Sequence, residues 1–269
     1  ARESVFLHTQ SAHWTGIVVT DPSTPTLGTD GVRGAHKALA ALHRSPDVMD
    51  ETGLAQGMPY DLLVLPEQPV IDGGSVEALA DFVEQGGKLL TSGSCVQSPE
   101  LRELLGIGSV RPGAYDDGHV ILHTSIEPTG IDSSWDRVEL RQATELYPLY
   151  LSWDQFNPEC RTIPNNWPMH GQLDEENPEP AGCAAAVIRT LGQGRIVHIC
   201  TDVFARYSTL VDPQILRWLR EIVHHLQPEP LLCTDAPSWV DVSLRRKGGS
   251  LLVHLLNCSP GRDVCRLYT

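Results

Sequence analysis

A continuous apolar run between polar residues marks the clearest element of the chain. Residues 60–66 read YDLLVLP, and successive apolar positions are typical of a strand buried on both faces of a sheet. Apolar residues then recur at helical spacing over 76–83, with Ser75 as the predicted N-cap and Gly86 as the left-handed stop. Residues 88–92 return as a strand. So short a strand–helix–strand unit predicts a right-handed parallel crossover and an open α/β sheet.

Neighbouring segments extend this sheet. The apolar run at 5–8 predicts a first strand, and residues 9–14 read as a polar loop. Helical spacing predicts a helix over 32–43, followed by a short strand at 47–49. A short helix is expected at 99–105. We therefore predict a flavodoxin-like, mostly parallel sheet with helices on both faces.

The periodicity weakens over residues 106–182, where prolines, tryptophans and acidic residues accumulate. We predict an irregular insertion there, with edge strands around 119–123 and 145–151. A segment of this length without regular structure usually has a function or packs on a partner.

Regular patterns return after the insertion. Residues 184–190 and 195–200 flank a Gly-Gln-Gly turn and predict a hairpin, which residues 201–204 are expected to leave as a loop. Pro213 suits the first position of a helix. The apolar stripe of that helix comprises Ile215, Leu216, Leu219, Ile222 and Val223.

The sequence Gln-Pro-Glu-Pro at 227–230 predicts a domain boundary. Residues 1–228 would form the α/β domain, and residues 229–269 a small antiparallel β-domain or its N-terminal part. Residues 240–246 and 250–257, on either side of a Lys-Gly-Gly turn, predict a second hairpin, with a third strand near Val264. Alternation at Val240, Val242 and Leu244 indicates a sheet with one solvated face. A lone hairpin is only marginally stable, so this unit should pack on the first domain or begin a larger one.

Charge and composition exclude several classes of partner. The 34 acidic residues outnumber the 20 Lys and Arg residues and give a net charge of −14, which argues against nucleic-acid binding.

The chain has no apolar run long enough to span a membrane. Its seven scattered cysteines form no CxxC pair, so we expect neither a zinc site nor a disulfide framework and favour the cytoplasm. The opening Ala-Arg-Glu-Ser, without an initiator methionine, predicts a piece of a longer protein.

The segments 60–66, 76–83 and 86–90 resemble the trimerisation domain of family 42-type β-galactosidases and related glycoside hydrolases. That domain is similar in fold to class I glutamine amidotransferases. The run GQGRIVHI at 192–199, followed by Asp202, looks like the last strand of such domains, and the hairpin at 240–257 is similar to the short β-domain that closes them.

The resemblance implies that the catalytic carboxylates lie on a TIM barrel outside this chain, because no segment here supplies a barrel of about 250 residues. The predicted function is therefore a non-catalytic accessory and oligomerisation region of a glycoside hydrolase, which would line the active site of the parent enzyme. Its predicted partners are copies of itself, as a trimer or dimer, and the missing barrel. No cofactor or metal is predicted.

The amidotransferase likeness raises one catalytic alternative. Cys95 follows the strand at 88–92, at a strand-to-helix turn where the field of a helix N-terminus would activate a thiol. A cysteine hydrolase using Cys95 would also need a nearby histidine, such as His13 or His198. Against this alternative, Gln97 stands where the amidotransferase pattern has glycine, and no His-x-Glu pair follows Cys200.

Ligands of an open α/β sheet bind at the carboxyl ends of its strands. The residues predicted to line such a pocket are Gln10, His13, Trp14, Pro66, Glu67, Gln68, Ser92, Cys95 and Asp202.

Other chemistry receives less support from the sequence. Tryptophans in irregular segments (Trp14, Trp135, Trp153 and Trp167) could stack on sugar rings, so a carbohydrate-binding module is a further alternative. His119 and His123 could share one face of a strand, although no second group of metal ligands accompanies them. The glycines at 28, 31 and 34 have the wrong spacing for a dinucleotide loop.

Overall fold

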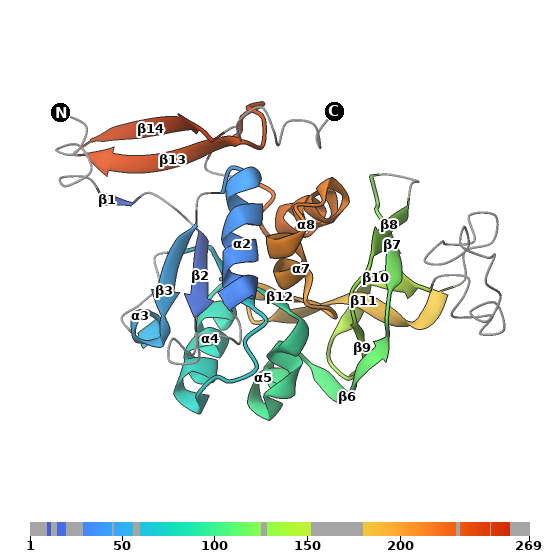
Figure 1. The fold of residues 1–269 in the computed structure, drawn as a ribbon. Helices are drawn as coiled ribbons and strands as arrows, with labels where there is room; N and C mark the ends of the chain where they lie inside the picture. The colour runs from blue at the N-terminus through green and yellow to red at the C-terminus, as the bar shows by residue number, and fades with distance from the viewer. Residues whose placement is uncertain are drawn as a thin grey trace, which may run out of the picture.

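The computed structural model describes residues 10–11, 15–19, 29–44, 46–55, 60–124, 128–151, 180–229, 232–247 and 249–258. Within these ranges the strands form a nine-stranded mixed sheet, a three-stranded sheet and a two-stranded sheet (Figure 1). In spatial order the large sheet consists of β3 (Asp47–Asp50), β2 (Thr15–Val19), β4 (Leu62–Pro66), β5 (Lys88–Ser92), β12 (Gly194–Ile199), β11 (Pro180–Leu191), β10 (Thr144–Tyr150), β7 (Gly118–Ile121) and β8 (Pro128–Ile131).

The half of the sheet from β3 to β12 is parallel, and the half from β12 to β8 is antiparallel. Every residue of β4 is buried, as its continuous apolar sequence predicts. Ser92 of β5 pairs with Pro66 of β4 on one side and with Ile199 of β12 on the other. The residues that follow these three strands therefore meet at one edge of the sheet.

Helices cover both faces of the parallel half (Figure 1). On one side α2 (Thr29–Ala41), α7 (Val203–Thr209) and α8 (Pro213–Leu226) pack against each other. On the other side lie α3 (Glu51–Ala55), α4 (Gly73–Glu84) and α5 (Pro99–Leu104). The fold is thus mixed α/β, with the predicted helices near residues 32–43, 76–83, 99–105 and 213–223 all present.

The described part of the predicted irregular insertion is regular β-structure, so that prediction was wrong for residues 107–150. β6 (Ile107–Tyr115) and β9 (Trp135–Leu140) form the two-stranded sheet, while β7, β8 and β10 extend the main sheet. The strands predicted near 119–123 and 145–151 exist, but β7 and β10 are both interior strands and not edges. The register of β10 against β11 shifts at Tyr147 and Pro148, and such shifts erase the two-residue alternation on which strand prediction depends. Residues 152–179 lie outside the described residues.

Three local predictions are corrected. The strand β2 lies between β3 and β4 but was not predicted; the strand expected at 5–8 lies outside the described residues. The N-cap of α4 is Asp72, whose carboxylate accepts hydrogen bonds from the Ser75 amide (2.9 Å) and hydroxyl (2.6 Å). The loop expected at 201–204 is replaced by the start of α7 at Val203.

The second predicted hairpin is present as β13 (Val240–Lys247) and β14 (Ser250–Asn257). β1 (Gln10–Ser11) adds a third strand to β13, and the third strand expected near Val264 falls outside the described residues. On one face of the hairpin Val242 is 1% exposed because β13 packs beside α2. Its direct partner Leu255 on β14 is 67% exposed. The apolar face of the hairpin is therefore covered on β13 and exposed on β14.

None of the helices in the described ranges has the length and apolar character that crossing a bilayer requires.

Candidate functional site

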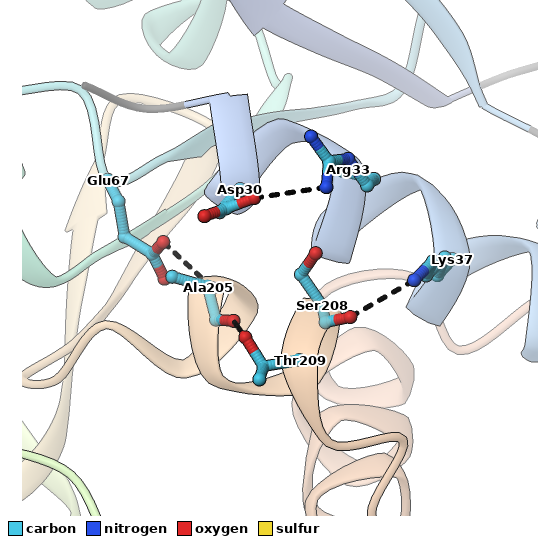
Figure 2. Close-up of polar contacts among 7 residues, drawn as sticks. All are labelled: Asp30, Arg33, Lys37, Glu67, Ala205, Ser208 and Thr209. Atoms are coloured by element: carbon cyan, nitrogen blue, oxygen red, sulfur yellow. Dashed lines mark hydrogen bonds and ion pairs between the residues drawn. The ribbon is translucent and has the colours of Figure 1, made fainter. Parts of the chain in front are cut away.

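Glu67 lies at the carboxyl edge of the sheet, directly after β4. Its backbone has a φ of 54°, a left-handed conformation that is uncommon for a non-glycine residue. The side chain is buried, and its carboxylate accepts a hydrogen bond from the backbone N–H of Phe204 at 2.7 Å. It also accepts one from the backbone N–H of Ala205 at 2.9 Å (Figure 2). The Ser92 hydroxyl also donates to it at 3.4 Å. Glu67 therefore caps the first turn of α7 from a distant strand.

The surroundings of this carboxylate favour its protonated form. Burial, followed by the negative charge of Asp202, raises the pKa of Glu67 to about 8, against the opposing hydrogen bonds from Phe204, Ala205 and Ser92. Asp202 is exposed on one side, yet desolvation raises its pKa as well. A carboxyl group that titrates near neutral pH suits acid–base chemistry. Here, however, its oxygens already bind the α7 backbone, which indicates a structural role.

Cys95 lies in the short helix η1 (Gly93–Gln97) that follows β5, and its side chain is fully buried. Its Sγ donates to the Leu65 carbonyl and accepts from the Gln68 amide, both at 3.3 Å. Burial is the main cause that raises the pKa of the Cys95 thiol to about 12. Because the thiolate is the nucleophilic form, this environment argues against the catalytic alternative.

The sharp turn after β5 places Gly93, and not Cys95, in the left-handed conformation, with a φ of 48°. A Cβ atom at Gly93 would lie 1.8 Å from Oδ1 of Asp202. The turn that would carry a nucleophile in an elbow-type site therefore has no room for a side chain.

His198 lies on β12 directly opposite Thr91 of β5. Its Nδ1 is 2.9 Å from the Thr91 hydroxyl, and burial lowers the pKa of His198 to about 3. The neutral ring is thus held inside the sheet by Thr91, so it does not serve as the base that a Cys95 mechanism would require.

The structure brings together six of the predicted pocket residues: Pro66, Glu67, Gln68, Ser92, Cys95 and Asp202. The first five are buried, so they pack against one another at the carboxyl edge of the sheet. Only the exposed Asp202, which accepts from the Ser94 amide at 3.1 Å, offers a group to solvent.

The remaining predictions for this site have separate outcomes. Gln10 pairs with Arg246 in the three-stranded sheet, and His13 and Trp14 lie outside the described residues. Trp135, predicted to be exposed, is fully buried, with its ring centroid 6.0 Å from that of Trp218. Trp153 and Trp167 also lie outside the described residues. β7 ends before His123, so His119 is buried in the strand while His123 is exposed beyond it.

The helix α7 and its cap were missed by sequence reasoning, although α2 carried a signal. A Cβ atom on Gly31 would lie 2.6 Å from the Glu67 carboxylate, and one on Gly34 would lie 1.8 Å from the Phe204 carbonyl. Gly34 lies inside the helix predicted over 32–43 and Gly31 directly precedes it, and two glycines at this spacing indicate a face against which another backbone packs closely.

Comparison with solved structures places this architecture in a known context. The chain matches the β-galactosidase from Bacillus circulans sp. alkalophilus with a TM-score of 0.63 and 15% identity, covering 94% of this chain and 36% of that one. It matches α-L-fucosidase isoenzyme 2 from Paenibacillus thiaminolyticus with a TM-score of 0.71 and 18% identity, covering 97% and 40%. For the β-galactosidase from Halorubrum lacusprofundi the TM-score is 0.58 and the identity 13%, covering 88% and 34%.

The chain therefore has the fold of one region of longer glycoside hydrolase chains, and it spans less than half the length of each of these three. No protein-family model and no curated protein matches the sequence. The likeness to family 42 β-galactosidases expected from the sequence is thus supported at the level of fold. The finer assignment to a trimerisation domain stays a prediction.

Proposed function

We propose that this chain is a non-catalytic accessory region of a larger glycoside hydrolase, which associates with copies of itself and lies beside the catalytic domain. The observation that carries this proposal is the match of nearly the whole chain to about a third of several longer hydrolases. Those hydrolases are named for different sugars, galactose and fucose among them. A region shared by enzymes of different specificity suits an architectural role better than sugar selection.

The chemistry of the described residues supports a non-catalytic role. The thiol of Cys95 is enclosed, the turn at Gly93 excludes a side chain, and Glu67 binds the backbone of α7. Cys95 and Glu67, two groups that could have performed catalysis at the carboxyl edge of the sheet, are therefore used to hold that edge together.

An exposed apolar face on β14 supports association with another copy. Leu251, Val253 and Leu255 share one face of the strand and are 49%, 50% and 67% exposed. The outer edge of β14 has no strand partner among the described residues. Apolar stripes on unpaired edge strands are prone to pair with a second chain, and we propose that the β14 face, defined by these three residues, contributes to the self-association.

Light scattering on the chain of residues 1–269, over a wide range of protein concentration, tests this proposal. We expect a closed oligomer, a dimer or a trimer, that dissociates when Val253 and Leu255 are both changed to Ser. The matched control is Val48→Ser, at an exposed residue (52%) on β3, an edge strand of the nine-stranded sheet, and it should leave the mass unchanged. A monomer at every concentration would contradict the self-association part of the proposal.

A further inference from the structure

A second candidate site lies at the other end of α2 from Glu67, about 20 Å away along the helix axis. A cavity of about 930 Å³ opens there between the end of α2, the outer side of α8, Pro228 and residues 232–236. This volume falls within the range of small-molecule sites. The cavity is separate from the packed carboxyl edge of the sheet and is independent of the accessory role proposed above.

His43 closes the end of α2 in an unusual conformation. Its φ is 58°, and the amides of His43 and Arg44 donate to the carbonyls of Ala40 and Leu39 at 2.9 and 2.8 Å. This is the Schellman pattern, in which glycine is the usual residue at the left-handed position. The imidazole is held there by its Nε2, which donates to the Ala236 carbonyl at 2.8 Å. Its buried Nδ1 has no hydrogen-bond partner, so the strained position presents an unsatisfied nitrogen.

Arg44, the next residue, carries an incompletely satisfied charge. Its Nη2 donates to the Gln227 carbonyl at 3.5 Å, while its buried Nη1 has no partner. Burial lowers the pKa of Arg44, and the electrostatic interaction with Cys233, which raises this pKa, offsets only part of the effect. A guanidinium removed from water in this way is costly unless an anion pairs with it.

The other charged groups of the cavity leave it positive. Arg217 and Arg220 join Arg44 on its lining, against the carboxylates of Glu221 and Asp235. Glu221 accepts from the Tyr147 hydroxyl at 2.7 Å and the Thr124 amide at 2.9 Å and keeps its negative charge, so the three arginines exceed the two carboxylates by one charge. This positive lining stands out on a chain whose net charge is −14.

We propose that this cavity binds a small organic anion, whose carboxylate or phosphate group pairs with Arg44 and contacts His43. Nη1 of Arg44, which has no hydrogen-bond partner, would donate to one oxygen of either anionic group. The apolar side chains of Leu42, Leu122 and Val223 line the same cavity and would contact the uncharged body of the ligand. Inorganic phosphate would then bind more weakly than a phosphate ester of similar charge.

Calorimetric titration and thermal unfolding of the chain of residues 1–269 test the site. The probes are inorganic phosphate, citrate and a hexose 6-phosphate, with the free hexose and sodium chloride of equal ionic strength as controls. We expect saturable binding of at least one anion and a rise of several degrees in Tm at about hundredfold excess over its Kd. A preference among the probes separates a phosphate site from a carboxylate site.

Three variants decide whether the response belongs to this cavity. Arg44→Gln should weaken binding about tenfold to a hundredfold, because a charged hydrogen bond is lost. His43→Gly should also weaken binding while leaving Tm unchanged or higher, because glycine relieves the left-handed strain. Arg33→Gln, at an exposed arginine of α2 paired with Asp30 (3.2 Å), should bind like the unaltered chain. Anions that stabilise no more than sodium chloride, or that stabilise the Arg44→Gln chain equally, would overturn the proposal.

Discussion

Glu67 connects three elements through one carboxyl group. Its backbone leaves β4, its oxygens cap α7, and the hydroxyl of Ser92 reaches it from the end of β5. The same enclosure that allows these contacts removes the group from water and raises its pKa. Its protonation state should therefore be visible in the stability of the whole domain.

The pH dependence of unfolding reports this coupling. The pKa of Glu67 rises from 4.5 to about 8 in the folded chain, so its contribution to stability is fully present below about pH 4.5 and is lost as the pH rises through about 8. We expect Glu67 to make the free energy of unfolding about 2–4 kcal/mol lower at pH 8 than at pH 5. Glu67→Gln keeps an accepting oxygen but cannot ionise. Urea unfolding of the variant should lack this part of the slope.

Glu67→Ala is the companion variant, because it removes the cap altogether. It should lower stability by about 1–3 kcal/mol at pH 5, where Glu67→Gln retains a cap. If the Glu67→Gln chain loses stability between pH 5 and pH 8 as steeply as the unaltered chain, then another group is responsible for the pH dependence.

Thiol labelling separates the buried cysteines from the exposed ones. Cys233 and Cys258 are exposed, whereas Cys95, Cys183 and Cys200 are buried. We expect an alkylating agent at neutral pH to modify the two exposed residues first and Cys95 only under unfolding conditions, as read by peptide mass spectrometry. Rapid native labelling of Cys95 would instead revive the hypothesis of a cysteine hydrolase.

At the scale of elements, the contact between α2 and α7 depends on backbone proximity. Gly31 and Gly34 leave room for the Glu67 side chain and the Phe204 carbonyl. Glu67 binds the amide of Ala205 in the first turn of α7, and the Lys37 amino group donates to the Ser208 carbonyl at 3.0 Å (Figure 2). A seven-residue helix, too short to be stable alone, is thus held at both ends by its neighbours.

Substitution of the α2 glycine tests this contact. Gly34→Ala should destabilise the chain by about 1–3 kcal/mol, because the new methyl group would overlap the Phe204 carbonyl. Gly73→Ala is the matched control, since a Cβ atom there meets nothing within 4 Å, and it should be neutral or slightly stabilising. Thermal unfolding measures both. If the two variants were equally stable, α7 would have moved away from the new methyl group without lowering the free energy of unfolding.

At the scale of the whole molecule, the hairpin β13–β14 is attached through one of its strands. Val242 on β13 is buried and Val253 on β14 is half exposed, although both side chains lie on the same face. Val242→Ser should therefore lower stability by about 1–3 kcal/mol, and Val253→Ser by less than about 0.5 kcal/mol. Unfolding at low protein concentration keeps association from affecting the comparison. A similar cost at both positions would show that β14 is covered as well as β13.

The helices α4 and α8 and the strands β4, β5 and β12 follow from sequence alone. Their apolar residues recur at the period of the element or run continuously, and their ends carry recognisable stop or start residues, such as Gly86 and Pro213. Parallel order also places the ends of β4, β5 and β12 together, which is why the sequence itself groups Glu67, Ser92 and Asp202. At these positions the residues that fit the local sequence pattern are also the residues that the tertiary contacts require.

The tertiary structure alone decided the remainder. β6 and β10 find partners far along the chain and contain register shifts, so no local period marks them. The role of Glu67 as the cap of α7 joins residues 137 positions apart, and the exclusion of a side chain at Gly93 depends on where Asp202 lies. Burial converts Cys95 from a candidate nucleophile into a core thiol. Enclosure and long-range proximity are properties of the packed chain, and a linear pattern of residues does not contain them.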